Sequence, residues 1–483
     1  MNEKSIQFGT DGWRDVIADQ FTFENVKVVT QGVCEYLEHK ANIDSDRRKI
    51  VIGYDTRFLS DRFAHIAGDV FGANQVKTMI SETAVPTPVL SHAVVDRGAD
   101  LGIMITASHN PYMYNGYKVK GPYGGSATMD IIEKIEKRVN RGIADGLFYR
   151  CLARDSANPE QNITSEDFIS GYRDHILGLV DTEVIKKYNF GLLIDPMYGA
   201  GQKIYRDIVS SLVKSEVAEI HSEINPSFGG LAPEPIGENL NQARQYLASH
   251  NLDMAICLDG DADRIGALAG DGSYISSHHI FAVVLDHLAG DRKLEGRVVK
   301  TVSTSSIIDR ICDHYGLELV TTPIGFKYIG QKIMEGNVIM GGEESGGLWC
   351  YGNIPERDGM LMGLKLVEIA SLKQKSISRI LDDIYERFGY FVYDRIDMEV
   401  TRDQKSRLSQ LLDKRVPAPI ESLQIDKVVT IDGYKYITGD GSWLMIRPSG
   451  TEAVVRLYAE SSSAQKLKGL LKTGKKVIDG ILG

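Results

Sequence analysis

Apolar residues occur along the chain in short unbroken runs separated by helical stretches, and one order of elements occurs three times. Each copy starts with an apolar strand, passes through a polar turn into a helix and reaches a second strand. The opening strand, turn and helix are expected at residues 49–63, 190–209 and 298–316. The second strands are expected at 76–80, 217–220 and 318–320.

A third apolar strand closes each copy, at residues 101–105, 254–258 and 338–340. These runs lack the alternation of a half-exposed strand, which is typical of strands covered by helices on both faces. Right-handed crossovers through the intervening helices then give α/β modules. The sequence therefore predicts three similar mixed α/β sandwich domains.

The last hundred or so residues break this rhythm. A strand is expected at 390–400, a helix at 403–412, a hairpin at 428–438 that turns at Asp432 and Gly433, strands at 442–446 and 454–460, and a final helix. This pattern predicts a smaller C-terminal α+β domain. We therefore expect four domains, at 1–154, 155–268, 269–386 and 387–483, with a linker at 155–161 and a junction at 387–389.

An unusual loop follows each third strand: TASHNP at 106–111, DGDADR at 259–264 and GGEESGG at 341–347. Ligands of open α/β sheets bind at the carboxyl ends of the strands. Three domains that each place such a loop there predict one site with a central cleft.

The TASHNP loop puts Ser108 in a tight turn, where its hydroxyl could act as a nucleophile or phosphate carrier. Ser108 and His109 are neighbours, and adjacent side chains rarely meet in the geometry of a catalytic triad. No G-x-S-x-G elbow surrounds the serine. An ordinary turn capped by Ser and Asn fits this loop as well.

The DGDADR loop places Asp259, Asp261 and Asp263 two residues apart after a buried strand. Carboxylates this close repel each other unless a cation neutralises them, and oxygen ligands favour Mg²⁺. An EF-hand does not fit, because Arg264 and Gly270 replace its glycine and glutamate. Arg264 could orient a phosphate. The alternative is a solvated acidic turn.

Two glycine-containing loops suit sugar and phosphate. Glu343 and Ser345 in GGEESGG are suited to hydrogen-bonding sugar hydroxyls, although a flexible loop explains the glycines equally. RPSGTE, at 447–452, combines a guanidinium with hydroxyls and a glycine turn, as in a phosphate clamp or a plain hairpin bulge. Arg14, Lys118 and Lys327 are further cationic candidates, although single lysines are more often solvated surface residues.

Together and in this order, the four loops resemble those of the α-D-phosphohexomutase family across nearly the whole chain. TASHNP matches the family's phosphoserine loop, DGDADR its metal loop, GEESGG its sugar-binding loop and RPSGTE its phosphate-binding loop. The resemblance implies reversible phosphoryl transfer between C1 and C6 of a hexose. The intermediate would be a 1,6-bisphosphate that turns around in the cleft.

The resemblance also implies a role for each matching residue. Ser108 would carry the phosphoryl group and, with Asp259, Asp261 and Asp263, would hold Mg²⁺. Arg14, Lys118 and Arg264 would surround the reacting group, and Lys118 or His109 would assist proton transfer. Glu343 and Ser345 would bind the sugar. The non-reacting phosphate would be held by Arg447, Ser449, Gly450 and Thr451, with help from Lys327.

The form GEESGG looks like that of glucose-type members, because mannose and glucosamine types usually carry Met or Gln at Glu344 and His at Gly347. The stretch from 115 to 125 also resembles phosphoglucomutases. A phosphoglucomutase activated by glucose 1,6-bisphosphate is therefore expected. Phosphomannomutase or dual activity stays open, as do a phosphatase using Asp259 and Asp261 and a sugar-phosphate-binding protein without turnover.

Composition limits the partners. The 483 residues carry a formal charge of −10, which argues against broad binding to nucleic acid or anionic lipid. The five cysteines are scattered without a C-x-x-C pair, which is typical of reduced thiols in the cytoplasm. Neither a secretory leader nor a membrane helix is expected. We expect hexose phosphates as partners and a monomer or homodimer.

Overall fold

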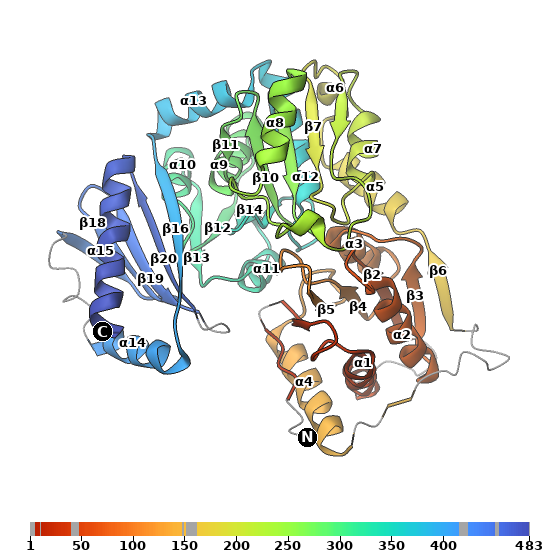
Figure 1. Cartoon of the computed structure of the whole chain (residues 1–483). Helices are drawn as coiled ribbons and strands as arrows, with labels where there is room; N and C mark the ends of the chain where they lie inside the picture. The colour runs from red at the N-terminus through yellow and green to blue at the C-terminus, as the bar shows by residue number, and fades with distance from the viewer. Residues whose placement is uncertain are drawn as a thin grey trace.

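The computed structural model describes residues 5–9, 11–39, 48–146, 149–150, 162–414, 424–449 and 454–482. These residues form four β-sheets with helices packed against them, and the C-terminal sheet stands to the left in Figure 1. The three α/β units and the smaller α+β unit expected from the sequence are therefore present.

The first unit has a six-stranded sheet of order β1-β5-β4-β2-β3-β6. Its strands are β1 (Trp13–Val16), β2 (Lys49–Tyr54), β3 (Lys77–Ser81), β4 (Leu101–Ile105), β5 (Tyr114–Lys120) and β6 (Ile163–Glu166). Its helices are α1 (Phe23–Glu38), α2 (Ser60–Ala73), α3 (Thr87–Asp96) and α4 (Met129–Ala144). β6 pairs with β3, so this sheet takes a strand from beyond residue 154, where we expected the first domain to end.

The second unit has a five-stranded sheet of order β11-β10-β9-β7-β8. Its strands are β7 (Leu192–Asp195), β8 (Val217–Glu219), β9 (Met254–Leu258), β10 (Ile265–Ala269) and β11 (Tyr274–Ile275). Its helices are α5 (Ile169–Gly178), α6 (Thr182–Ile185), α7 (Ile204–Ser210), the short 3-10 turn η2 (Phe228–Gly230) and α8 (Asn241–His250). The linker expected at 155–161 lies outside the described residues.

The third unit has a four-stranded sheet of order β13-β12-β14-β15. Its strands are β12 (Arg297–Thr301), β13 (Glu318–Thr322), β14 (Val338–Gly342) and β15 (Leu348–Cys350). Its helices are α9 (Ser277–Asp286), the π-helical turn η3 (His287–Asp291), α10 (Ile307–Tyr315), α11 (Phe326–Met334), α12 (Gly359–Lys373) and α13 (Ile377–Phe388).

The fourth unit is an antiparallel sheet of order β16-β20-β19-β18-β17 with two helices. Its elements are β16 (Val392–Glu399), α14 (Arg402–Lys414), β17 (Ile425–Val429), β18 (Tyr434–Thr438), β19 (Trp443–Pro448), β20 (Val454–Ser461) and α15 (Ala464–Leu482). Each element covers the segment in which the sequence predicted it, with ends that differ by a few residues.

The first three sheets share one four-stranded pattern. In each, a central strand pairs in parallel with both neighbours, and the third strand pairs antiparallel with a fourth. The three special loops therefore lie at the turns of the hairpins β4–β5, β9–β10 and β14–β15. This repeated topology brings the same kind of turn from each unit to the site.

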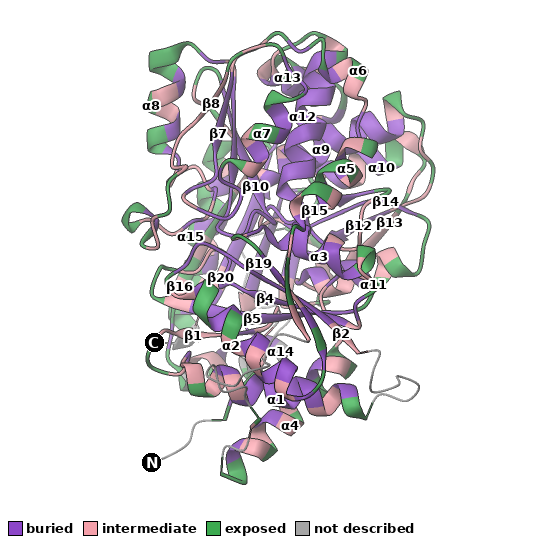
Figure 2. Cartoon of the chain, turned by 90° about the vertical axis from the view of Figure 1, so that its right-hand side faces the viewer, coloured by how far each residue is buried: buried purple, intermediate pink, exposed green. Residues whose placement is uncertain are grey.

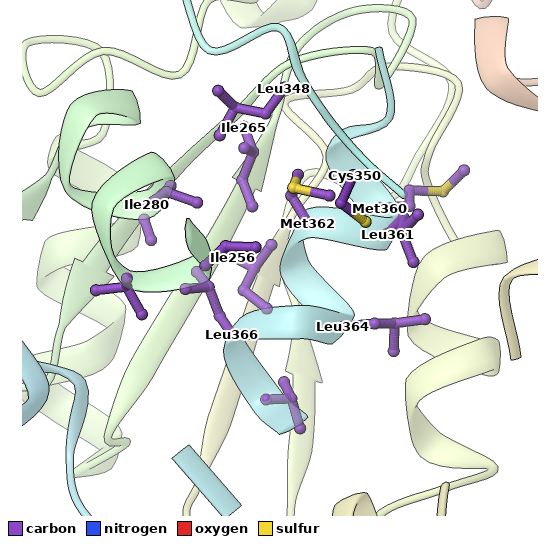
Figure 3. Close-up of a cluster of buried hydrophobic side chains, with 14 of the residues drawn as sticks. Ile256, Ile265, Ile280, Leu348, Cys350, Met360, Leu361, Met362, Leu364 and Leu366 are labelled. Atoms are coloured by element: carbon purple, nitrogen blue, oxygen red, sulfur yellow. The ribbon is translucent and has the colours of Figure 1, made fainter. Parts of the chain in front are cut away.

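The second and third units share a hydrophobic core centred on α12 (Figure 3). Every residue of α12 from 359 to 371 is buried, as Figure 2 shows, because the helix is apolar around most of its circumference. The carboxylate of Asp358 caps its first turn by accepting a hydrogen bond from the Leu361 amide. These two units are thus held to each other by continuous apolar packing.

Four of the five cysteines lie among the described residues and are buried and unbonded, at Cys34, Cys257, Cys312 and Cys350. Burial raises the pKa of each of these thiols, so they remain protonated. Within the described ranges, no helix has both the length and the apolar character needed to cross a bilayer.

Candidate active site

The hairpin turns of the first and second units meet at Ser108. Its Oγ lies 2.9 Å from Asp259 Oδ2, to which it donates a hydrogen bond across 151 residues of sequence. Ser108 is fully buried and has a left-handed backbone (φ 53°), which is uncommon for a residue with a side chain. The fold therefore fixes a strained serine against the acidic loop.

Arg57 holds the serine loop in this shape. Its guanidinium donates hydrogen bonds of 2.5–3.1 Å to the backbone carbonyls of Ser108, Asn110, Pro111 and Tyr114. Asp55 pairs with Arg57 Nε at 3.2 Å and accepts a 2.6 Å hydrogen bond from Thr106. Sequence reasoning missed Arg57, and its only signal was its place directly after the first strand of the repeat.

The three aspartates of DGDADR form one buried cluster. One carboxylate oxygen from each of Asp259, Asp261 and Asp263 lies within 4.8 Å of the others, and all three side chains are fully buried. Burial first, then Asp263 and Asp261, raise the pKa of Asp259 well above its usual value. This burial rules out the alternative of a solvated acidic turn, and the geometry suits a metal ion.

Two cations partly neutralise the cluster. Lys118 Nζ lies 2.8 Å from Asp261 and 3.4 Å from Asp263, and Arg357 Nη2 lies 2.7 Å from Asp263. Burial raises the pKa of Asp261, but Lys118 offsets this and holds it below its usual range. Lys118 is fully buried, so the prediction that such a lysine is solvated was wrong.

Asp11, in the turn that precedes β1, binds the same two cations. Its Oδ2 lies 2.9 Å from Lys118 and 2.7 Å from Arg357. Arg14 Nη2 approaches the same oxygen at 3.5 Å, and Arg14 Nη1 donates to Asn110 of the serine loop at 2.8 Å. Asp11 and Arg357 were both missed as site residues, although Asp11 lies only three residues before Arg14, which the sequence analysis singled out.

His109 and Arg264 complete the surroundings of the serine. His109 Nδ1 lies 3.5 Å from Ser108 Oγ. The two side chains are therefore closer than we expected for residues that are adjacent in the sequence. Burial first, and then Arg264 and Arg14, hold the pKa of His109 well below its usual range. Its imidazole is therefore neutral at pH 7.

The third unit contributes the GGEESGG turn. Burial raises the pKa of Glu343 to about 7, although Arg357 Nη1 at 3.5 Å opposes this. The Glu344 carboxylate accepts hydrogen bonds from Thr301 and Ser303 at 3.1 and 2.7 Å. Ser345 lies in the same turn, partly buried. Glu343 is thus joined to the aspartate cluster through Arg357.

The fourth unit contributes Arg447 at the end of β19. Arg447 Nε pairs with Asp432 at 2.9 Å, and Ser449 is buried beside it in the chain. Gly450 and Thr451 of the same motif lie outside the described residues. Lys327 is the second residue of α11 in the third unit and lies partly buried, with its Nζ 3.1 Å from Met129 Sδ.

Comparison with known proteins matches successive parts of the chain to domains of the same family. Family models described as phosphoglucomutase/phosphomannomutase match residues 5–145 (α/β/α domain I), 170–272 (domain II), 276–388 (domain III) and 399–473 (C-terminal domain). A phosphoglucomutase from Komagataeibacter xylinus is 30% identical over 99% of this chain and 91% of its own length.

The chain belongs to the α-D-phosphohexomutase family. It is an enzyme of the phosphohexomutase class, a mutase rather than a phosphatase. A phosphoglucomutase/phosphomannomutase from Thermococcus kodakarensis is 28% identical over 98% of this chain and 99% of its own length. A phosphoglucosamine mutase from Methanococcus maripaludis is 30% identical over 91% and 94%.

Solved structures agree on the fold of this phosphohexomutase. A protein from Thermus thermophilus, provisionally named as a phosphomannomutase, is 30% identical, covers 99% of both chains and has a TM-score of 0.85. An Aspergillus fumigatus N-acetylphosphoglucosamine mutase has a TM-score of 0.62 at 16% identity and covers 99% of this chain and 97% of its own. The latter structure is a complex with GlcNAc-6P and magnesium.

Proposed function

We propose that this phosphohexomutase interconverts glucose 1-phosphate and glucose 6-phosphate through a phosphoserine at Ser108. The observation that carries the proposal is the buried Ser108 hydroxyl, 2.9 Å from a carboxylate of a three-aspartate cluster and surrounded by cations. Phosphoryl transfer depends mainly on positioning and on stabilising charge, and this arrangement supports both.

The reaction consists of two transfers that balance each other. Phosphorylated Ser108 gives its phosphoryl group to the free hydroxyl of the bound monophosphate, so the serine P–O bond breaks and a sugar P–O bond forms. His109 or Lys118 would assist the transfer of the proton from that hydroxyl, and the product is the 1,6-bisphosphate. After the intermediate turns around, its other phosphoryl group returns to Ser108. The sugar oxygen that loses this group takes up the proton released in the first transfer, which leaves the isomeric monophosphate.

The aspartate cluster fits a resident Mg²⁺. Asp261 Oδ1 and Asp263 Oδ1 are buried and have no hydrogen-bond partner among the described residues, so both can take part in binding a metal ion. Hard carboxylate oxygens in this number are ligands that Mg²⁺ accepts. When bound by Asp259, Asp261 and Asp263, the ion would supply positive charge next to the oxygens of the phosphoryl group.

The surrounding cations would stabilise the charge of the transfer. Arg14, Lys118 and Arg264 come from the first and second units, and we add Arg357 from the third because it contacts the same aspartate as Lys118. His109 Nδ1, 3.5 Å from Ser108 Oγ, lies close enough to assist transfer of the proton of the attacking hydroxyl. Burial lowers the pKa of Lys118, but Asp11, Asp261 and Asp263 outweigh it and raise the pKa above its usual value. Lys118 is therefore protonated and would assist proton transfer through its charge.

The third unit would bind the sugar, and the fourth unit would bind the distal phosphate, which is the phosphate that does not react. Glu343 and Ser345 would bind the sugar hydroxyls in either orientation of the intermediate. The phosphate that does not react would be held by Arg447, Ser449, Gly450 and Thr451, with Lys327 as a further cation. The monomeric or dimeric state and the cytoplasmic location remain predictions.

We propose glucose, and not mannose or glucosamine, as the sugar because the GGEESGG turn carries two glutamates, as in glucose-type members of the family. The relatives bear the names of phosphoglucomutase, phosphoglucomutase/phosphomannomutase and phosphoglucosamine mutase, so they do not select one sugar. Phosphomannomutase or dual activity is the second candidate, since glucose and mannose differ only in the orientation of the C2 hydroxyl.

A direct comparison of substrates tests the proposal. We expect kcat/KM for glucose 1-phosphate to exceed the values for mannose 1-phosphate and glucosamine 1-phosphate, with Mg²⁺ and glucose 1,6-bisphosphate present in all three assays. A higher value for either rival sugar would overturn the choice of glucose. Release of inorganic phosphate in place of isomerisation would overturn the mutase reaction itself.

A further inference from the structure

Hydrogen bonds among the described residues join the fourth unit to the third at two places. At the first, Lys435 Nζ donates to the Val302 carbonyl at 2.8 Å, and Glu460 accepts from the Ser306 amide at 3.0 Å. At the second, Asp432 Oδ2 accepts a hydrogen bond from the Ile324 amide at 3.0 Å. The first contact involves no residue that we assign to the site. The second involves Asp432, which also binds Arg447.

Both carboxylate oxygens of Asp432 are engaged by different units. While Oδ2 receives the Ile324 amide, Oδ1 lies 2.9 Å from Arg447 Nε in its own unit. A charged group that receives two donors in this way has little freedom to rotate. Asp432 therefore links the orientation of the Arg447 guanidinium to the backbone of the third unit.

The turn that carries Asp432 is pressed against the strand that carries Arg447. Gly433 has a positive φ of 81°, and a Cβ there would lie 2.7 Å from the Ile446 carbonyl and 3.0 Å from Arg447 Cβ. Only glycine fits this approach. The backbone thus fixes how closely the turn that carries Asp432 approaches the base of the Arg447 side chain.

A guanidinium held at Nε presents its two Nη atoms in one direction. Arg binds phosphate best through two parallel hydrogen bonds, so the direction of these atoms decides how well an anion is held. Ile324 lies three residues before Lys327, the other cation assigned to the distal phosphate. Asp432 therefore joins the segments that carry both cations.

We propose that Asp432 is a positioning residue that aims Arg447 at the distal phosphate of the hexose phosphate when the fourth unit rests on Ile324. The inference rests on the proposed function, because it assumes that Arg447 binds this phosphate. Contact between the two units and affinity for the phosphate are then linked, and each strengthens the other.

The test begins with Asp432→Asn, which keeps the shape but removes the negative charge. The distal phosphate is held alike before and during transfer, so we expect KM for the best hexose 1-phosphate to rise about tenfold with kcat changed little. Asp440→Asn is the matched control, because Asp440 lies in the next turn and pairs with exposed Lys466. We expect it to match the wild type.

A double-mutant cycle separates positioning from general support of the fold. If Asp432 acts through Arg447, then Asp432→Asn should change KM less than about twofold in an Arg447→Ala background. Additive effects in the cycle would overturn the inference. An unchanged KM in Asp432→Asn, with a raised KM in Arg447→Ala, would also overturn it.

Failure of the proposed function gives a different result. If Arg447→Ala leaves KM unchanged, Arg447 does not bind the distal phosphate, and the proposed site and the inference both fall. Should Asp432→Asn not fold, as judged by circular dichroism, Asp432→Ser enters the same cycle, with the same expected and contradicting results.

Discussion

Arg57 supports the site without binding the substrate, because its hydrogen-bond donors are occupied by other groups of the protein. Its guanidinium donates hydrogen bonds to backbone carbonyls of the loop that contains Ser108. Its side chain is fully buried together with that of Asp55. The left-handed backbone of Ser108 is thus maintained by a buried ion pair.

Replacement of Arg57 by alanine should destabilise the protein by about 3–5 kcal/mol, because it leaves the Asp55 carboxylate buried without its cation. Urea unfolding followed by circular dichroism measures this loss. Arg141→Ala is the control, since the Arg141 side chain is 81% exposed and we expect no measurable change. Equal unfolding midpoints for Arg57→Ala and the wild type would contradict this role of Arg57.

At the residue scale, the motif residues could be predicted and their partners could not. Ser108 and the three aspartates have side chains whose chemistry is visible in a short pattern. Arg57 and Arg357 act on groups far away in sequence, on carbonyls in one case and on Asp11 and Asp263 in the other. No local pattern reveals such long-range contacts.

At the scale of elements, the three parallel strands of each repeat could be predicted because they are continuous apolar runs. The fourth strands, β5, β10 and β15, were not predicted. β5 reads YNGYKVK, and its two lysines are typical of an exposed segment, yet both are fully buried. Carboxylates from other units, Asp261 and Glu356, compensate their charge, which the sequence alone does not show.

The close approach of two hairpin turns gives a prediction at this scale. A Cβ at Gly260 would lie 2.5 Å from the Ser108 carbonyl, so Gly260→Ala should push the metal loop away from the serine. We expect Mg²⁺ affinity to fall at least about tenfold, as measured by calorimetric titration of the protein without substrate.

Gly178→Ala is the matched control for this change. Gly178 ends α5, and a Cβ there meets no atom within 4 Å, so its Mg²⁺ affinity should equal that of the wild type. Unchanged Mg²⁺ binding in Gly260→Ala would mean that the two turns can separate without cost, against the geometry described above.

At the scale of the whole molecule, the net charge does not describe the distribution of charge at the site. The chain carries −10 overall, yet Arg14, Lys118, Arg264 and Arg357 gather from three units around one buried cluster. The prediction that nucleic acid is no partner rests on the overall charge, whereas an anionic substrate requires only the local one. Assembly of the units creates this local field.

Docking of the fourth unit gives a pH-dependent prediction. Burial first, and then Lys300, lower the pKa of Lys435 to about 7 from an ordinary value of 10.5. The folded protein therefore favours neutral Lys435, and this part of its stability is present above pH 10.5 and is lost as the pH falls through 7.

Lys435→Met removes the titrating group while keeping an apolar contact with Trp443, whose ring centre lies 3.7 Å from Lys435 Nζ. We expect the thermal midpoint of the wild type, relative to that of Lys435→Met, to be higher at pH 9.5 than at pH 7. Thermal unfolding at the two pH values checks this. The same difference at both pH values would contradict a depressed Lys435 pKa.

The central claim is that Ser108 carries the phosphoryl group between the two positions of the sugar. Its most direct test is incubation of the protein and Mg²⁺ with glucose 1,6-bisphosphate labelled in its phosphoryl groups, followed by peptide mass spectrometry. We predict label on Ser108, its transfer to added glucose 6-phosphate, and none on a Ser108→Ala variant. Label on Asp259, or full isomerase activity in Ser108→Ala, would contradict the account.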